Sequence, residues 1–197
     1  MTQEILRFWF GSNADDAAAA AEKSRLWWSK DSAVDAQIRE RFQDLVEAAG
    51  RGELTHWAAT AHGRLALILL TDQFPRNIYR GTPRAFAFDP VARLQCQEGI
   101  AVGDDRTLRL IERVFFYLPL EHSESAEDQA QSVGLFSELA NRAPAAQRAL
   151  FDGFLDYAVR HRDIIERFGR FPHRNAILGR PSTPEEIAFL RTPGSSF

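Results

Sequence analysis

The sequence predicts an all-α protein, built as a single-domain array of antiparallel helices. Apolar residues recur at spacings of three and four along the chain, and no segment sustains the alternation of a β-strand. The connections between the expected helices are brief, which favours antiparallel packing of successive helices. The 197 residues, 45% of them hydrophobic, fit one large core, and no stretch has the composition of a linker. We therefore expect residues 1–197 to form one all-helical domain.

Glycines and a proline mark the ends of the helices expected in the first half. Gly11 and Gly50 follow apolar stretches, and Pro75 disfavours a helical conformation in the residue before it. Ser32 is an expected N-cap. The elements expected here are Gln3–Phe10, Ala14–Lys30, a helix from Ser32 to Gly50, a fourth at Leu54–Ala61, and Arg64–Phe74.

Caps and prolines divide the second half in the same way. After a loop at Arg76–Phe88, Asp89 reads as an N-cap followed by proline in the first turn. The helix before Pro119 is apolar nearly all round, so we expect it to be central and buried. The helices expected here are Asp89–Gly103, Thr107–Leu118, one from Ser123 or Ser125 to about Arg142, Pro144–Phe168, and a short one after Thr183.

The composition limits where the protein works and what it binds. A net charge of −3 gives no support to nucleic-acid binding, which needs broad positive surface. The single cysteine, Cys96, excludes an intramolecular disulfide. The first residues lack the pattern of a secretion signal, and the longest apolar run, Leu65–Leu70, is too short to cross a bilayer. We expect a cytoplasmic protein that binds neither nucleic acid nor membrane.

Two similar segments, FPRN at Phe74–Asn77 and FPHRN at Phe171–Asn175, end two of the expected helices. In one interpretation the two segments cap helices: phenylalanine packs on the core, proline stops the helix, and arginine bonds to free carbonyls. Alternatively, arginines form a fork of donors for a carboxylate or phosphate. The residues that would bind such an anion are Arg76, Asn77, Arg80, Arg170, Arg174 and Asn175.

Polar residues on apolar helix stripes indicate a possible site near these segments. Asp72 continues the stripe of Leu65, Ile68 and Leu69, and His161 lies on a comparable stripe, so both point toward the core. A buried carboxylate needs a partner, and an arginine of an FPRN segment is the economical choice for Asp72. The proton-transfer candidates are Asp72, Glu121, His122, His161 and His173. The same side chains suit a metal, but no HExxH-type spacing supports one, so we assign no metal ligands.

Four separated strings form a recognisable set: LRFWFG at Leu6–Gly11, TDQFPRN at Thr71–Asn77, YLPLEHSE at Tyr117–Glu124 and FGRFPHRNAILGR at Phe168–Arg180. Together they resemble the bacterial domain-of-unknown-function 924 family. The resemblance spans almost the whole chain and implies an all-α fold similar to tetratricopeptide-repeat proteins. No repeat of the W-L-G-Y type is present, so any repeats here are eroded. The family brings no activity with it, and no catalytic residue or cofactor follows from it.

The sequence leaves three functions open. The first is an enzyme or binding protein that holds a small anionic ligand in a polar pocket at helix ends, where six arginines in 160–180 face only two acidic residues. The second is a helical scaffold that binds a peptide or protein partner in a groove. In the third, the arginine-rich segments are purely structural. The relative positions of the candidate residues decide among them.

Overall fold

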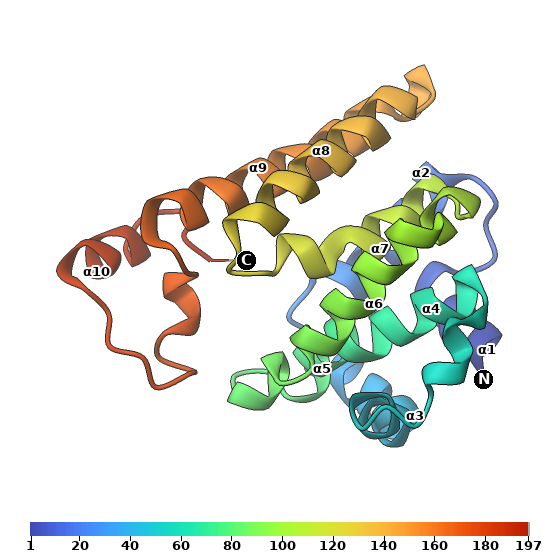
Figure 1. The fold of residues 1–197 in the computed structure, drawn as a ribbon, viewed down its shortest axis with the longest axis horizontal. Coiled ribbons are helices and arrows are strands. Elements are labelled where there is room, and N and C mark those ends of the chain that lie inside the picture. Colours follow the sequence, from blue (N-terminus) through green and yellow to red (C-terminus); the bar gives the residue numbers. More distant parts are fainter. Residues whose placement is uncertain (197) are drawn as a thin grey trace.

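The computed structural model describes residues 1–196, and every regular element in that range is helical (Figure 1). The predicted all-α array is confirmed. The α-helices are α1 (Thr2–Phe10), α2 (Asp16–Trp28), α3 (Ser32–Gly50), α4 (Ala61–Ile68), α5 (Phe74–Ile78), α6 (Asp89–Val102), α7 (Leu110–Glu121), α8 (Ala126–Arg142), α9 (Arg148–Phe168) and α10 (Pro184–Leu190). A π-helical turn, Leu69–Gln73, joins α4 to α5, and short 3₁₀ turns lie at Thr55–Ala59, Pro83–Phe86, Asp104–Thr107, Ala145–Gln147 and Pro172–Arg174.

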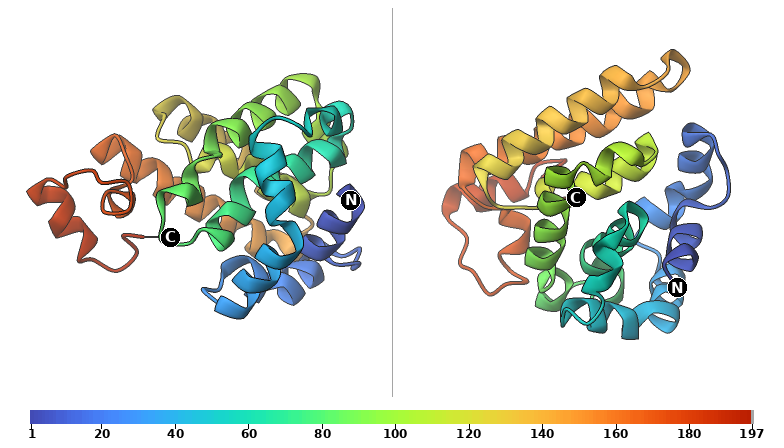
Figure 2. Two further views of the ribbon diagram at one scale, coloured as in Figure 1. Left: turned by 90° about the horizontal axis from the view of Figure 1, so that it is seen from below. Right: turned by 45° about the vertical axis from the view of Figure 1, so that its right-hand side comes forward.

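The helices surround the centrally placed α7, as its apolar sequence predicts. The residues from Ile111 to Glu121 are all buried. The hairpin of α8 and α9 projects from the rest of the molecule, and α10 lies at the end remote from α1 (Figures 1 and 2). The antiparallel hairpin places the end of α9 near the start of α8, close to the turn that follows α7.

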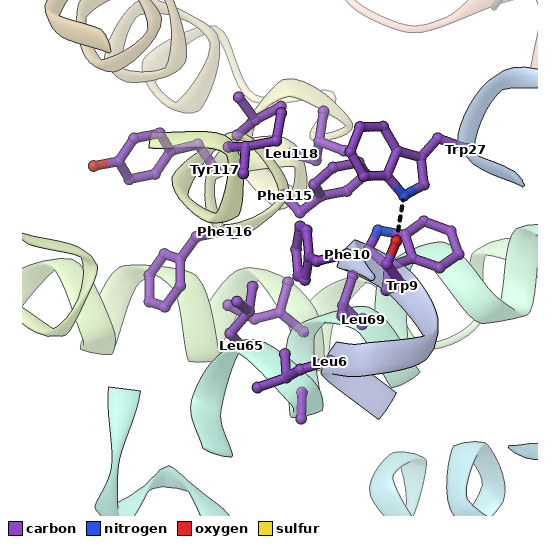
Figure 3. Packing of buried hydrophobic residues seen from close by; sticks show 14 of the residues in the cluster. Leu6, Trp9, Phe10, Trp27, Leu65, Leu69, Phe115, Phe116, Tyr117 and Leu118 are labelled. Atoms are coloured by element: carbon purple, nitrogen blue, oxygen red, sulfur yellow. Dashed lines mark hydrogen bonds between the residues drawn. The ribbon is translucent and has the colours of Figure 1, made fainter. Parts of the chain in front are cut away.

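One hydrophobic core runs from α1 to α9. Aromatic rings from distant segments meet in it: the Phe115 ring lies 5.5 Å from the Trp9 ring and 4.7 Å from the Trp27 ring. The Trp27 indole donates to the Trp9 carbonyl at 3.0 Å (Figure 3). A small separate cluster of Ile164, Ile165 and Phe171 joins the end of α9 to the segment that follows it. The C-terminal segment therefore packs on the end of α9 through a cluster separate from the main core. Polar interactions also connect the segment to the rest of the protein.

The expectation that the helix stops at Pro75 is wrong. The π turn carries α4 directly into α5, and the Phe74 amide bonds to the Leu69 carbonyl. Pro75 then stands in the first turn of α5, where a missing N–H is tolerated. Within the loop expected at Arg76–Phe88, residues 76–78 belong to α5 and residues 83–86 form a 3₁₀ turn. The π turn contains Asp72, and such turns are frequent at functional sites.

Four other features also differ from the sequence-based expectation. Pro119 lies inside α7 and does not end it; only two helical residues follow, so the lost hydrogen bond falls at the helix end. The element expected at Leu54–Ala61 is a shorter 3₁₀ turn. Asp89 does not cap α6: Phe88 occupies the N-cap, and the Asp89 carboxylate binds Arg76 instead. Asp31, whose side chain accepts from the Ala33 amide, caps α3 in place of Ser32.

Candidate functional site

Asp72 is the centre of a buried polar cluster. Its carboxylate is fully buried and contacts His122 Nδ1 at 2.7 Å, Arg76 Nη1 at 3.1 Å and Gln73 Nε2 at 2.5 Å. The predicted partner, an arginine of an FPRN segment, is therefore confirmed as Arg76. Burial raises the pKa of Asp72, but the charge of Arg76 and the contact with His122 outweigh it and leave the pKa well below 3.8. Asp72 is a fixed negative charge.

The contact with Asp72 sets the state of the His122 ring. Asp72 accepts a hydrogen bond from the Nδ1–H group, so the neutral imidazole carries its lone pair on Nε2. Burial and the positive charge of Arg76 lower the pKa of His122 despite the carboxylate. The side chain is 15% exposed. His122 is thus an oriented, neutral base at the edge of the cluster.

Glu121 and His161 form a second pair beside the first. The His161 Nδ1 atom lies 2.8 Å from the Tyr157 carbonyl oxygen and 3.1 Å from Glu121 Oε1. Burial, with the nearby charge of Asp72, raises the pKa of Glu121 to about 8. Burial and the neighbouring His122 lower the pKa of His161 to about 3. At neutral pH this contact therefore joins two uncharged groups and is not an ion pair, despite its short distance.

The Arg174 guanidinium is buried, with a residue exposure of 6%, yet makes no hydrogen bond to any of residues 1–196. Its one ion-pair contact is long: 3.7 Å from Nη1 to Asp89 Oδ2. Aromatic rings flank it, with the guanidinium carbon 4.8 Å from the Phe86 centroid and 4.5 Å from that of Phe171. Burial and the charge of Arg76 lower its pKa to about 10. Of its three nitrogens, Nε is fully buried and has no hydrogen-bond partner, and a buried donor without an acceptor is costly and rare in native proteins.

Contacts around these side chains form a closed circuit. Asp72 touches His122, whose ring centroid is 6.1 Å from that of His161. The circuit continues through the His161–Phe171 ring contact at 5.5 Å, the Phe171–Arg174 contact, the Arg174–Asp89 pair at 3.7 Å, the Asp89–Arg76 bonds at 2.9 and 3.1 Å, and the Arg76–Asp72 pair. Contacts thus link side chains from the π turn, α5, α6, the C-cap of α7, α9 and the segment from Phe171 to Arg174.

His173 adjoins this circuit through its neighbour Phe171, with ring centroids 5.6 Å apart. Its pKa falls to about 4, mainly through burial and then through the charge of Arg174. The five proton-transfer candidates named from the sequence therefore share one neighbourhood.

Four of the predicted anion-binding residues instead form two structural clips. Arg80 donates to both oxygens of Asp35 at 2.7 and 2.8 Å, and Asn77 donates to the same carboxylate at 2.9 Å. In the second clip Arg170 donates to Glu186 at 2.6 and 2.8 Å, and Asn175 lies 3.3 Å from Glu186. These arginines are already paired, so the structure gives them no spare donor set comparable with that of Arg174.

Sequence reasoning missed the residues that complete the surroundings of Arg174. Asp89 was expected to cap α6, yet it accepts two hydrogen bonds from Arg76. Phe86, in an expected loop, packs on the guanidinium of Arg174. Glu124 holds the C-terminal segment by accepting from Arg180 at 2.7 and 2.9 Å and from the Phe171 amide at 2.8 Å. No local pattern identifies such partners, because each lies far from the arginine in the sequence.

Access to the cluster is narrow. The side chains of Arg76, Asp89 and His122 are 20%, 23% and 15% exposed, and Phe86 and His173 are also partly exposed. Two surface hollows, of about 350 and 570 Å³, lie elsewhere, the first beside Trp57 and the second beside Leu26. Among residues 1–196, no three histidine, cysteine or acidic side chains are grouped to hold a metal. None of the helices in that range is both long and apolar enough to span a bilayer.

Comparison with known proteins agrees with the fold. A family model described as "Bacterial protein of unknown function (DUF924)" matches residues 5–194. The solved structure of a protein of unknown function from Agrobacterium tumefaciens is similar, with 43% sequence identity and a TM-score of 0.75. The match covers 90% of this chain and 99% of the other. Among curated proteins, none matches the chain.

Proposed function

Because the chain belongs to the DUF924 family of bacterial proteins, which is of unknown function, we propose a function from its site: the protein binds a small anion at Arg174, beside His122. The observation that carries this proposal is the buried Arg174 guanidinium, which makes no hydrogen bond within residues 1–196. A carboxylate or phosphate oxygen would satisfy its donors, and charge-assisted bonds of this kind are strong.

The surroundings favour a small ligand over a peptide. The members of the cluster that reach the surface, among them Arg76, Asp89 and His122, are each only partly exposed. His122 Nε2 would stand ready to accept a proton from the bound molecule, held in orientation by Asp72. If His122 accepts a proton from the bound molecule, the protein would also catalyse an acid–base reaction of that ligand. A scaffold for peptides would use an exposed groove and would not depend on Arg174.

A titration with acetate at pH 7 tests the proposal, with binding detected by saturation-transfer NMR and by calorimetry. A ligand of so few atoms reaches a Kd on the order of 0.1 mM at best. The variant Arg174→Gln keeps the polar side chain but removes the charge, and we expect it to weaken binding about 10- to 100-fold. Acetamide, which has the shape of acetate without its charge, should not bind.

The matched control is Arg80→Gln. Arg80 follows the FPRN segment but is paired with Asp35, so this variant should bind acetate as the wild type does. Equal weakening by the two variants would mean that acetate senses only the general charge of the protein. Unchanged binding in Arg174→Gln, with the fold intact by circular dichroism, would refute the assignment of the anion to Arg174.

A further inference from the structure

The C-terminal segment, residues 170–196, carries Arg174 and has a polar centre of its own. The Glu186 carboxylate accepts hydrogen bonds from Arg170 at 2.6 and 2.8 Å, and the Asn175 amide lies 3.3 Å from it. Apolar packing joins the segment to the end of α9 through the small cluster around Phe171. These contacts lie within the segment or between it and α9, so they hold the segment together but do not place it against the rest of the protein.

Glu124 fastens the C-terminal segment to the turn that follows α7. Its carboxylate accepts hydrogen bonds from both terminal nitrogens of Arg180, at 2.7 and 2.9 Å, and from the Phe171 amide at 2.8 Å. Phe171 and Arg180 stand on either side of Arg174 in the chain, so these bonds bracket the turn that carries the guanidinium. Glu124 and Arg180 are also the last residues of two strings singled out in the sequence, YLPLEHSE and FGRFPHRNAILGR.

The turn that presents Glu124 is itself held in place. It follows directly on α7, the buried central helix, and begins at His122, the C-cap of that helix. The Gln129 side chain donates to the carbonyl oxygen of Glu121 at 2.6 Å and to that of Ser123 at 2.8 Å. Glu124 therefore has a fixed position relative to His122, and the segment that it binds is placed relative to His122 as well.

Arg174 has few contacts of its own that orient it. Its Nη1 atom lies 3.7 Å from Asp89, and its Nε atom has no acceptor within residues 1–196. The Phe86 and Phe171 rings attract the guanidinium, but such contacts lack the directional preference of a hydrogen bond. The position of Arg174 therefore depends on how the C-terminal segment docks.

We propose that Glu124 is a positioning residue of the anion site: it docks the C-terminal segment and so sets Arg174 against Asp89 and Phe86. This inference rests on the proposed function, because the position of Arg174 matters for binding only if the anion binds there. An anion that binds the docked state more tightly must in turn favour docking, because the two equilibria are linked.

A distance measurement by double electron–electron resonance reads the docking directly. Nitroxide labels at Leu94→Cys on α6 and Ile187→Cys on α10 span the contact, and these two side chains are 51% and 44% exposed. Cys96 is fully buried and should take no label. We expect one narrow distance distribution in the otherwise wild-type protein. Glu124→Gln keeps the shape of the side chain but removes its charge, and should add a second, broad population.

Acetate titration of the same proteins links docking to the site. An apparent Kd rises as the inverse of the fraction of protein in the binding-competent state. If the docked fraction of Glu124→Gln falls to between about one third and one tenth, its Kd for acetate should rise about 3- to 10-fold. Saturating acetate should also return its distance distribution toward the narrow one. A residue with a merely structural role would not show this proportion between docked fraction and affinity.

The matched control is Glu185→Gln. Glu185 lies on α10 of the same segment, but it is 63% exposed and pairs with Arg167 of α9. This variant removes the same charge without touching the contact between Glu124 and Arg180. It should keep both the narrow distance distribution and the wild-type affinity for acetate.

The outcomes separate this inference from the proposed function. Failure of acetate to bind the wild type would refute the anion site and, with it, this inference. A narrow distribution and wild-type affinity in Glu124→Gln would overturn the role of Glu124 and leave the anion site standing. A broad distribution with unchanged affinity would also overturn it, because docking would then not set Arg174. If Glu124→Gln fails to fold, Arg180→Gln removes the same ion pair from the other side and should give the same two changes.

Discussion

Replacing Arg174 with methionine should stabilise the unliganded protein. The guanidinium makes no hydrogen bond within residues 1–196, and its one ion-pair contact is a 3.7 Å approach to Asp89. Asp89 meanwhile has two shorter bonds from Arg76, at 2.9 and 3.1 Å. Removing Arg174 therefore leaves Asp89 with its main partner. Methionine is long and apolar enough to fill the space between Phe86 and Phe171 and makes favourable sulfur–aromatic contacts.

The magnitude follows from the pKa of Arg174. Burial and the charge of Arg76 lower it from 12.5 to about 10. At about 1.4 kcal/mol for each tenfold change in proton affinity, the charged form is disfavoured by about 3 kcal/mol relative to the unfolded chain. The two ring contacts return about 1–2 kcal/mol of cation–π attraction. We expect Arg174→Met to raise the free energy of unfolding by about 1–2 kcal/mol.

Urea unfolding of the wild type and variant, without added anions, measures this difference. The control is Arg170→Met, which removes the two bonds to the buried Glu186 and should lower the free energy of unfolding. If Arg174→Met lowers the free energy of unfolding by more than about 1 kcal/mol, the guanidinium stabilises the native fold. Its burial would then be no argument for a ligand site.

Two further predictions concern stability. His161 is buried and neutral in the folded protein, with a pKa of about 3 against an ordinary 6.5, so the unfolded chain binds more protons as the pH falls below 6.5. At pH 5 this should lower the free energy of unfolding by about 2 kcal/mol, and unfolding curves of His161→Gln should lack that part of the acid sensitivity. Gly63→Ala should unfold at much lower urea concentration, because its new Cβ would lie 2.0 Å from the Trp57 carbonyl oxygen; Gly134→Ala, in the exposed face of α8 with nothing within 4 Å, should gain about 0.5–1 kcal/mol. Equal effects of the two alanines would contradict the packing described around Gly63.

The apolar stripes were enough to predict the inward direction of Asp72 and His161. Helical spacing fixes which face a side chain occupies, and both residues are buried as that spacing requires. The same reasoning correctly made α7 the central helix. The proline rule failed to give the helix ends: Pro75 and Pro119 remain within helical segments, because Pro75 stands in a first turn and Pro119 near a last one.

The sequence could not separate the arginines of the candidate set from one another. Arg170 and Arg174 are four residues apart, yet one is paired with Glu186 and the other makes no hydrogen bond within residues 1–196. Their partners come from different elements, and the choice depends on how the C-terminal segment docks through Glu124. Composition shows that arginines gather here, whereas only the fold shows which of them is unsatisfied.

Corresponding residues of the FPRN and FPHRN segments make the same kinds of contact. The one contact in which the segments differ is therefore informative. In each, the phenylalanine is fully buried and the asparagine joins a carboxylate clip, with Asp35 in one and Glu186 in the other. In each, the arginine turns toward Asp89 and packs near Phe86: the Arg76 and Arg174 guanidinium carbons lie 5.7 and 4.8 Å from that ring.

Arg76 donates two hydrogen bonds to Asp89 and contacts Asp72, whereas Arg174 lies 3.7 Å from the same Asp89 carboxylate and donates no hydrogen bond to it. A pure capping device would have no reason to bury a second arginine at that point, because its buried Nε has no acceptor and the ring contacts recover only part of the cost of desolvation. An anion from solution would supply the missing acceptor. The unequal bonding of two equivalent arginines, more than the number of arginines, is therefore what argues for a ligand.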